Sequence, residues 1–355
     1  MRLSIALLGA GRLGAAHART LASLPEARLT IVADPQRAAR AVAAAVGARF
    51  LADPYAAIHH PEVEAVVIVT PTGTHAALIE TAARAGRAIF CEKPIALDVP
   101  ATERALAVVR ETGVPLQIGF QRRYDPGFAE AQRVIVAGEL GRLHLLRSVS
   151  HDPYPPPPPY IPECGGQFVD MSIHDLDIAR FLMGDEVEAV SGVGARLGPE
   201  APAFAAADDW DTTVLSLRFR GGALGSIVNS RQAGYGYDIH TEVLGDRGGL
   251  KVGYERHTPI TRYDRGGAHH DYVPYFPERF AQAYALELQA FVAAVQDGKP
   301  VTPTGADGLA ALRVALAATQ SARGDGAWVR VLTGPRVRLS WPWASGFSSP
   351  WRSAS

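Results

Sequence analysis

The stretch Gly9-Ala10-Gly11-Arg12-Leu13-Gly14 decides how this sequence folds. It directly follows the apolar run Leu3–Leu8, and the residues after it have the spacing of a helix. A glycine at position 9 permits a tight turn, Gly11 lets a ligand approach the backbone, and Gly14 lets helix and strand pack closely. The free N–H groups at the helix N-terminus can then bind phosphate oxygens. The pattern therefore predicts a dinucleotide site on a strand–turn–helix unit.

One carboxylate, Asp34, stands twenty positions after Gly14, at the end of the second apolar run. In dinucleotide-binding folds an acidic residue at this place accepts hydrogen bonds from the adenosine ribose. Its charge would repel a 2′-phosphate, so the sequence favours NAD(H) over NADP(H). Arg37 lies close enough to bind such a phosphate. We interpret Arg37 as a solvated helix residue, and NADP(H) stays the alternative cofactor.

The first 120 residues alternate apolar runs with Ala- and Arg-rich segments of helical periodicity. Runs that are apolar on both faces are typical of parallel strands covered by helices on both sides. We therefore expect an α/β fold whose residues 1–122 form an N-terminal Rossmann NAD-binding domain. The expected strands are Leu3–Leu8, Leu29–Ala33, Ala65–Val69, Ala88–Cys91 and Leu116–Phe120.

After residue 122 the pattern predicts an α+β domain with an open, largely antiparallel sheet, over residues 123–332. Five consecutive prolines, Pro155–Pro159, should be extended and lie on the surface or over a cleft. Residues 333–355 have no periodicity, and we expect an irregular C-terminal tail. The expected helices are Phe128–Ala137, Phe168–Leu182, Arg279–Gln296 and Ala306–Ala322, and the expected strands are Leu143–Val149, Glu188–Ala195, Thr212–Phe219, Ala223–Asn229, Tyr237–Leu244 and Gly249–Val252.

Composition excludes several classes of function. The 355 residues carry 35 basic and 36 acidic side chains, a formal net charge of -1, so no basic excess supports nucleic-acid binding. No run approaches the roughly 18 apolar residues of a membrane span, and the apolar start of the chain is too short for a secretory signal. The two cysteines, Cys91 and Cys164, cannot form a disulfide framework or a zinc site. We expect a cytoplasmic protein.

Two segments carry residues suited to oxidising an alcohol. Lys93, in Glu92-Lys93-Pro94, follows a predicted parallel strand at the edge where open α/β sheets bind ligands, and the proline is a candidate for a cis bond. Asp170 and His174 are spaced i, i+4 on a predicted helix, so their side chains share one face. A neutral histidine can accept the hydroxyl proton while the carboxylate supports it.

Two further features that contain histidine have other interpretations. His174-Asp175-Leu176-Asp177 resembles a cluster of metal ligands, but no further His or Cys has suitable spacing, so we predict no metal. We interpret His17, on the first helix, as a structural residue.

In combination, these motifs resemble the Gfo/Idh/MocA oxidoreductase family. The resemblance runs in order from residue 1 to about residue 332. Within the family the chain is most similar to inositol 2-dehydrogenases, through Asn229-Ser230-Arg231-Gln232-Ala233 and Tyr235-Gly236-Tyr237-Asp238. The family motifs are the dinucleotide fingerprint, Thr70-Pro71-Thr72-Gly73-Thr74-His75, Glu92-Lys93-Pro94, Gly119-Phe120-Gln121-Arg122-Arg123-Tyr124-Asp125 and Gly165-Gly166-Gln167-Phe168-Val169-Asp170-Met171-Ser172-Ile173-His174-Asp175.

The resemblance implies a role for each matching residue. Lys93 would position the reacting hydroxyl and contact nicotinamide, His174 would be the general acid/base, and Asp170 would bind substrate hydroxyls. The full set predicted to bind the cofactor is Gly9, Gly11, Arg12, Leu13, Gly14, Asp34, Thr70, Pro71, His75, Glu92, Lys93 and Gln121. The set predicted to contact substrate is Lys93, Arg122, Asp152, Asp170, His174, Tyr235 and Tyr237.

The sequence therefore predicts an NAD-dependent dehydrogenase of a cyclic polyol, with myo-inositol ahead of other substrates. A dehydrogenase or reductase of another sugar or inosose is the alternative within enzymes. A cofactor-binding regulator without turnover is the alternative outside them, although such a protein should have lost part of the Lys93, Asp170 and His174 set. By resemblance we also expect a homodimer or homotetramer formed through the C-terminal sheet.

Overall fold

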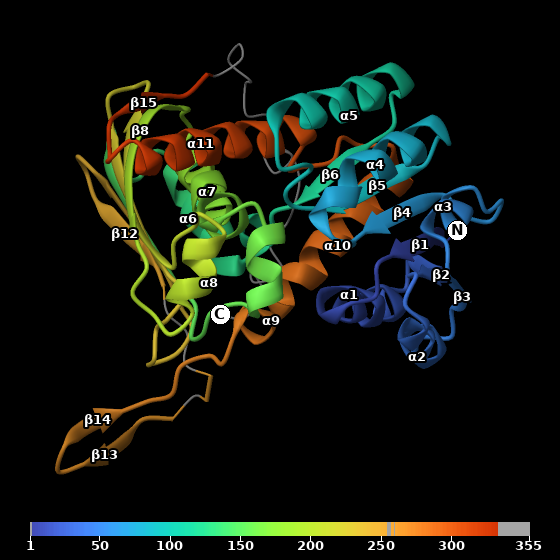
Figure 1. The fold of residues 1–355 in the computed structure, drawn as a ribbon, viewed down its shortest axis with the longest axis horizontal. Coiled ribbons are helices and arrows are strands. Elements are labelled where there is room, and N and C mark those ends of the chain that lie inside the picture. The colour runs from blue at the N-terminus through green and yellow to red at the C-terminus, as the bar shows by residue number, and fades with distance from the viewer. Residues whose placement is uncertain (1, 254–256, 259, 333–355) are drawn as a thin grey trace.

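The computed structural model describes residues 2–253, 257–258 and 260–332, which form two large sheets with their helices and a separate two-stranded hairpin (Figure 1). The first sheet is parallel throughout, with strand order β3-β2-β1-β4-β5-β6. Its strands are β1 (Leu3–Leu8), β2 (Ala27–Ala33), β3 (Arg49–Leu51), β4 (Ala65–Ile68), β5 (Ala88–Glu92) and β6 (Leu116–Gly119). The five expected strands are confirmed, and the sequence missed only the three-residue edge strand β3 among these six.

Helices bury both faces of this sheet, as its doubly apolar strands require. Alternate residues of β1 enter opposite cores: Ala6 and Leu8 pack with α4 (His75–Arg84) and α5 (Val99–Thr112), whereas Ile5 and Leu7 pack on the other side. The helices on that other side are α1 (Arg12–Ser23), α2 (Arg40–Ala45) and α10 (Ala281–Asp297). A further short helix, α3 (Pro54–Ile58), joins the first core.

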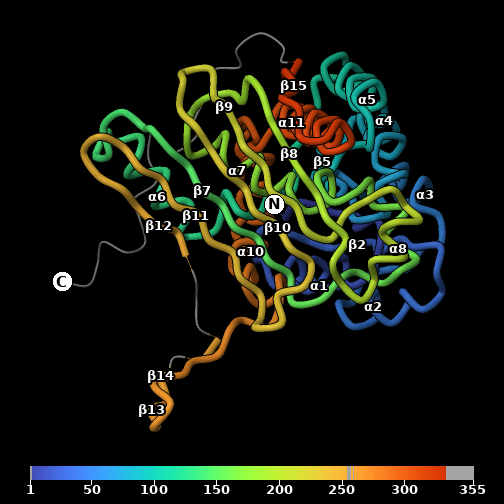
Figure 2. The backbone as a smooth tube through the Cα atoms, turned by 60° about the vertical axis from the view of Figure 1, so that its left-hand side comes forward, coloured from blue at the N-terminus to red at the C-terminus, as the bar shows by residue number. Residues whose placement is uncertain are grey.

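The second sheet has the order β12-β11-β7-β10-β9-β8-β15, and only its β7–β10 pair is parallel. Figure 2 shows β12, β11 and β7 running side by side. One face packs on α6 (Pro126–Val136), α7 (Ile173–Met183) and α11 (Gly305–Arg323). The expected open, largely antiparallel sheet is confirmed. Its strands are β7 (Leu143–His151), β8 (Val187–Ala195), β9 (Thr212–Phe219), β10 (Leu224–Ser230), β11 (Asp238–Gly245), β12 (Gly249–Val252) and β15 (Val329–Arg330).

Three local expectations need correction. The expected α-helix Phe168–Leu182 begins as a π-helix over Phe168–Ser172 and becomes α-helical only in α7. The expected helix Arg279–Gln296 is divided into α9 (Phe276–Arg279) and α10. The proline run is extended only up to Pro157, because a 3₁₀ turn, Pro158–Glu163, begins at the next residue. Proline is tolerated at the start of a helix, since the N–H that it lacks would have no partner within the helix there.

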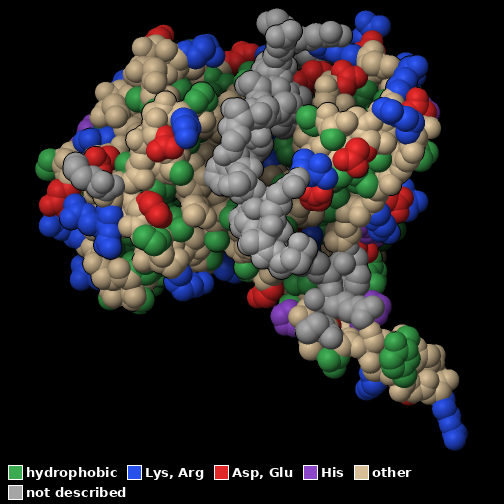
Figure 3. Space-filling model, turned by 180° about the vertical axis from the view of Figure 1, so that it is seen from behind, with side chains coloured by type: hydrophobic (Ala, Val, Ile, Leu, Met, Phe, Trp, Pro, Cys, Tyr) green, Lys and Arg blue, Asp and Glu red, His purple; other side chains and the backbone are tan. Residues whose placement is uncertain are grey.

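A hairpin of β13 (Arg262–Asp264) and β14 (Gly267–His269) projects away from both sheets (Figures 1 and 3). All six of its strand residues are exposed. The sequence did not predict it, since it has neither an alternating apolar pattern nor a buried face. Helix α8 (Ala201–Ala206) was also missed.

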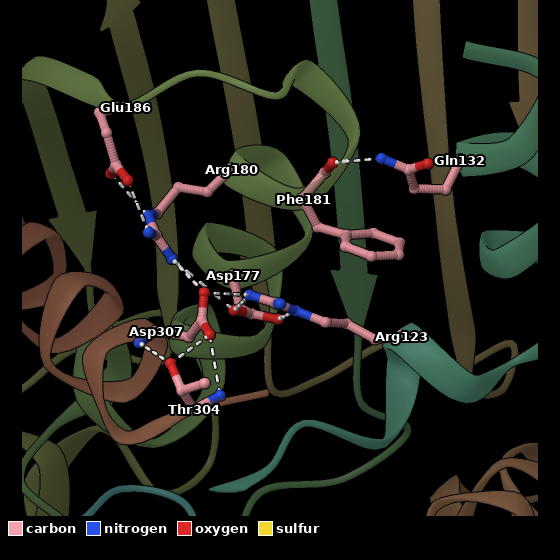
Figure 4. Close-up of polar contacts among 8 residues, drawn as sticks. All are labelled: Arg123, Gln132, Asp177, Arg180, Phe181, Glu186, Thr304 and Asp307. Atoms are coloured by element: carbon pink, nitrogen blue, oxygen red, sulfur yellow. Dashed lines mark hydrogen bonds and ion pairs between the residues drawn. The ribbon is translucent and has the colours of Figure 1, made fainter. Parts of the chain in front are cut away.

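A buried network of charges ties the two sheets together at the predicted domain boundary (Figure 4). Arg123, just after β6, donates to Asp177 of α7 at 2.8 and 2.5 Å and to Asp307 of α11 at 3.0 Å. Arg180 of α7 donates to both oxygens of Glu186 at 2.7 Å. The boundary between residues 122 and 123 stays a prediction, and the predicted tail 333–355 lies outside the described residues.

Replacing Glu186 by glutamine should destabilise the fold by about 2 kcal/mol, because it removes a charge-assisted bidentate partner from a buried arginine. Arg180 is only 1% exposed, so water cannot replace the lost partner. The midpoint of urea unfolding measures the effect. As a control, Glu188→Gln removes an exposed carboxylate that lies 3.9 Å from Arg330, and it should change stability by less than about 0.5 kcal/mol. Equal shifts in the two variants would contradict a stabilising role for the buried pair.

Candidate active site

The glycine loop after β1 has the geometry expected of a phosphate-binding turn. Gly9 has φ +93°, and a Cβ there would come within 2.6 Å of the Val69 carbonyl oxygen. A Cβ on Gly14 would come within 2.2 Å of the Gly9 carbonyl oxygen, so only glycine fits where α1 crosses the loop. At Gly11, by contrast, nothing lies within 4 Å of an added Cβ. Gly9 and Gly14 thus serve chain packing, whereas the open space at Gly11 leaves the backbone accessible to a ligand.

Asp34 lies beside this loop at the end of β2. One carboxylate oxygen, Oδ2, accepts a hydrogen bond from the Ala10 N–H at 2.8 Å. The other, Oδ1, accepts from the Gln36 N–H at 2.7 Å. These bonds fix the carboxylate next to the loop and leave lone pairs for ribose hydroxyls. Arg37 is exposed in the following turn.

His75 connects the loop after β4 to the loop after β5. Its buried ring lies between two carbonyl oxygens, with Nε2 2.7 Å from Thr70 O and Nδ1 2.8 Å from Pro94 O. Burial lowers the pKa of His75, although both carbonyl groups act against that shift. The Lys93–Pro94 peptide bond is cis. His75 therefore links the loop that carries Thr70 to the loop that carries Lys93 and Pro94.

Glu92 and His17 form a buried pair behind the same edge of the sheet. His17 Nε2 lies 2.8 Å from Glu92 Oε1, and the His17 ring is fully buried against Phe90 and Tyr284. This placement agrees with a structural role for His17. Gln121 is also buried, and its Oε1 has no hydrogen-bond partner within the described chain. An amide ligand group placed there would supply the missing donor.

The structure brings Lys93 and Asp170 together from the two halves of the chain. Lys93 Nζ donates to the Asp170 carbonyl oxygen at 2.6 Å and lies 3.5 Å from Asp170 Oδ1. Lys93 follows β5, whereas Asp170 belongs to the π-helix before α7. Insertions of π geometry are frequent at functional sites, where they change which side chains share a face. The contact across 77 residues joins the cofactor edge to the predicted catalytic helix.

Two residues that the sequence analysis did not select also hold Asp170. Arg231 Nη2 donates to Asp170 Oδ2 at 2.9 Å, and the Tyr160 hydroxyl donates to Asp170 Oδ1 at 3.0 Å. Burial alone would raise the pKa of Asp170, but the positive charges of Lys93 and Arg231 outweigh it, and the pKa is lowered. Asp170 is therefore an ionised acceptor at neutral pH.

His174 lies at the start of α7, with its ring edge-on to Phe120 at a centroid distance of 6.2 Å. Its buried Nδ1 has no hydrogen-bond partner among the described residues. Burial is the main reason that the pKa of His174 is well below its ordinary value, and the positive charges of Lys93 and Arg122 lower it further. The imidazole is therefore neutral at physiological pH, as a general base must be.

Three further residues predicted to contact substrate, Asp152, Tyr237 and Tyr235, have different surroundings. Asp152 directly follows β7, and its pKa is raised to about 6 by burial, with Asp170 adding to the shift and Arg231 opposing it. Tyr237 is buried against Tyr275 and Phe280. Tyr235 is half exposed, and its hydroxyl contacts His151 at 2.7 Å and Asp238 at 3.0 Å. Their substrate contacts stay predictions.

Arg122 is held by a buried carboxylate that the sequence analysis considered only as a metal ligand. Its Nη1 donates to Asp175 Oδ1 at 2.8 Å, while Ser148, Ser150 and Asn229 also donate to that carboxylate. Asp177 is paired with Arg123. Asp175 and Asp177 thus anchor arginines, and in the described ranges of the chain no group of three or more His, Cys, Asp or Glu side chains could hold a metal ion.

Both halves of the chain match profiles of one known protein family. Residues 3–120 match the profile described as an oxidoreductase family, NAD-binding Rossmann fold. Residues 133–331 match that of the same family's C-terminal alpha/beta domain. Together the two matches cover most of the chain.

Individual relatives match the chain over most of its length. The chain is 42% identical over 321 residues to scyllo-inositol 2-dehydrogenase (NAD(+)) of Bacillus subtilis, covering 90% of this chain and 93% of the relative. It is 42% identical over 326 residues to inositol 2-dehydrogenase of Rhizobium meliloti, covering 90% and 97%. Among solved structures, scyllo-inositol dehydrogenase from Lactobacillus casei with bound NAD(H) and scyllo-inositol superposes with a TM-score of 0.86 at 30% identity, covering 94% of this chain and 100% of that one.

Proposed function

Because the chain belongs to the Gfo/Idh/MocA oxidoreductase family, we propose that it is an NAD-dependent inositol dehydrogenase that oxidises one ring hydroxyl to a ketone. The observation that carries the proposal is the position of Lys93. It contacts Asp170 at the edge of the first sheet from which the loops predicted to bind the cofactor begin. A neutral His174 lies on the same helical segment as Asp170. myo-Inositol is the first substrate to test, and the alternative is a dehydrogenase or reductase of another sugar or of an inosose.

The residues have complementary roles in this reaction. Lys93 donates a hydrogen bond to the reacting hydroxyl oxygen and stabilises the negative charge that develops on it. His174 accepts the hydroxyl proton. Bound NAD⁺ supplies the acceptor for the hydride that leaves the same carbon. Asp170, ionised and held from three sides, accepts hydrogen bonds from substrate hydroxyls.

The polar character of the site suits a polyol. Such a substrate has no charge and no large apolar face, so it must be recognised through many short hydrogen bonds. Asp152, Arg122 and Tyr237 are predicted to supply some of them. A site built in this way rejects an analogue that lacks one hydroxyl, because a buried polar group is left unpaired.

Activity with a panel of substrates tests the function. The chain is incubated with NAD⁺ and each of myo-inositol, scyllo-inositol and several aldoses, and absorbance of the reduced cofactor is followed. We expect turnover with an inositol at a higher kcat/KM than with any aldose. Higher values for an aldose would favour the sugar alternative. Tight NAD binding without turnover of any polyol or sugar would instead favour the non-catalytic regulator.

Cofactor preference should depend on Asp34. Replacing Asp34 by alanine removes the ribose acceptor and the charge that repels a 2′-phosphate, so the kcat/KM ratio of NAD to NADP should fall about tenfold or more. Initial rates with both cofactors measure the ratio. The control Arg37→Ala changes an exposed neighbour and should leave the ratio within about twofold of wild type. An unchanged ratio in D34A would count against the ribose contact.

We further propose that the chain forms a homodimer or homotetramer through the outer face of the second sheet. Apolar side chains lie opposite one another on this face: Val193 faces Val214, and Leu145 faces Leu224 on one side and Leu244 on the other. All five are exposed. Light scattering should give a dimer or tetramer, and Val214→Lys with Leu224→Lys should shift the mass to a smaller species. A wild-type monomer would contradict this.

A cytoplasmic location is also part of the proposal. Cys91 and Cys164 are both free and buried, which suits a reducing compartment. Over the described residues, no helix is long and apolar enough to cross a membrane.

A further inference from the structure

The five prolines Pro155–Pro159, here called the proline strap, lie between two tyrosines with different surroundings. Before the strap, Tyr154 packs on Tyr275 with ring centroids 4.9 Å apart. After it, Tyr160 lies in the 3₁₀ turn and its hydroxyl donates to Asp170. The strap therefore connects an aromatic contact at one end with a hydrogen bond to the predicted substrate-binding carboxylate at the other.

The strap is unusually restricted in conformation. Each proline ring fixes φ near −65° and removes an N–H donor, so five in a row leave the segment few alternatives. The 3₁₀ turn, which begins within the strap at Pro158, is held locally, because the Tyr160 N–H donates to the Pro157 carbonyl oxygen at 2.9 Å, and Ile161 is buried. Tyr160 itself is 44% exposed. A half-exposed side chain on a flexible backbone would lose conformational entropy when it forms its hydrogen bond. The rigid strap reduces this cost, because it fixes the backbone at Tyr160.

The hydrogen bonds of Asp170 show what Tyr160 contributes. Oδ2 accepts from Arg231 at 2.9 Å, whereas the direct hydrogen bond to Oδ1 at 3.0 Å comes from Tyr160, with Lys93 Nζ more distant at 3.5 Å. Without Tyr160, Oδ1 keeps only that longer contact, so the orientation of the carboxylate about χ2 depends mainly on the Arg231 bond to Oδ2. With Tyr160, both oxygens accept a direct hydrogen bond, so their remaining lone pairs have defined directions.

We infer that the proline strap delivers Tyr160 as a positioning residue, which holds Asp170 in the orientation that binds a substrate hydroxyl. The inference rests on the proposed function, since it assigns Asp170 to polyol binding. Tyr160 acts through Asp170, so its loss weakens substrate binding more than it slows the chemical step. This predicts a rise in KM with little change in kcat.

Kinetics of Y160F with NAD⁺ and the best inositol test the inference. Removing one hydrogen bond to a charged group should raise KM about tenfold, with kcat within about twofold of wild type. Because Tyr160 is half exposed and phenylalanine keeps the ring, the variant should fold normally. The matched control is Y154F, which removes the hydroxyl from the tyrosine at the other end of the strap and keeps its ring contact with Tyr275. Its KM should equal that of the wild type.

A double-mutant cycle tests the strap itself. Pro155→Gly with Pro156→Gly loosens the segment without touching Tyr160 and should raise KM about threefold, because the tyrosine must then be ordered on binding. The same glycines added to Y160F should have no further effect, since nothing remains for the strap to deliver.

The outcomes separate this inference from the proposed function. If the wild type turns over no polyol and binds none by calorimetry with NAD present, both fail together. If the wild type turns over an inositol but Y160F has an unchanged KM, the inference alone is wrong. It is also wrong if Y160F and Y154F change kcat and KM by the same factors. If the glycines raise KM by the same factor with and without Tyr160, the strap does not act through this residue.

Discussion

Replacing His174 by alanine should lower kcat by about 10²- to 10⁴-fold, the usual contribution of a positioned general base. The imidazole is neutral because burial, with Lys93 and Arg122 nearby, keeps its pKa well below the ordinary value. Its loss removes the neutral imidazole that accepts the hydroxyl proton. Affinity for NAD should change by less than about twofold, because the glycine loop and Asp34 lie on other elements. Stopped-flow or steady-state rates give kcat, and fluorescence titration gives the NAD dissociation constant.

His269→Ala is a suitable control for this variant. His269 lies in the exposed hairpin strand β14, where it contacts Asp264 at 3.0 Å. Its replacement should change neither kcat nor NAD affinity. If His174→Ala abolished NAD binding, or kept more than a tenth of wild-type kcat, the role of general base would be wrong.

Most of the fold follows from periodicity. Strands β1, β9 and β12 begin and end where the apolar or alternating pattern does. The missed strands β3 and β15 have only three and two residues, too few to establish a pattern. Such edge strands form because a neighbouring strand offers unpaired N–H and C=O groups, not because their own residues prefer extension.

The site was predictable in part, because its motifs lie next to recognisable elements. Lys93 directly follows a strand, and Asp170 and His174 share a helical segment, so the resemblance could place them in one centre. The structure brings Lys93 and Asp170 into contact. Tyr160 lies in none of the recognised motifs, and Arg231 lies in the Asn229–Ala233 motif, which by itself indicates no contact with Asp170. Arg231 reaches Asp170 from the end of β10, 61 residues later, through a sheet register that the sequence does not specify.

Asp175 shows the same limit from the opposite direction. Its neighbours in sequence resemble a cluster of metal ligands, although no metal was predicted, and in the structure it accepts hydrogen bonds from Arg122, Ser148, Ser150 and Asn229. These donors come from three other segments of the chain. Whether a buried carboxylate meets a cation, an arginine or several hydroxyls depends on packing, and residue spacing alone did not distinguish them.

Replacing Lys93 by methionine should lower kcat/KM by about 10²- to 10³-fold, the usual cost of removing a donor that stabilises developing oxyanion charge. Methionine nearly keeps the volume and length of the side chain but has no charge and no donor. It also removes the bond to the Asp170 carbonyl oxygen and the cation 3.5 Å from the carboxylate. NAD affinity should fall less than activity, since the phosphate and ribose contacts are made elsewhere.

The same variant should move the pH dependence in a defined direction. Burial is the main cause of the lowered pKa of His174, and the positive charge of Lys93 is the next. Without that charge the imidazole protonates more readily, so its pKa rises. Because only neutral His174 can accept a proton, the acid limb of kcat/KM should move to higher pH. Lys93→Arg keeps the charge, so its rate should fall while the acid limb stays at the wild-type pH. An acid limb that is unchanged in K93M, or that moves to lower pH, would mean that Lys93 does not set the protonation of His174.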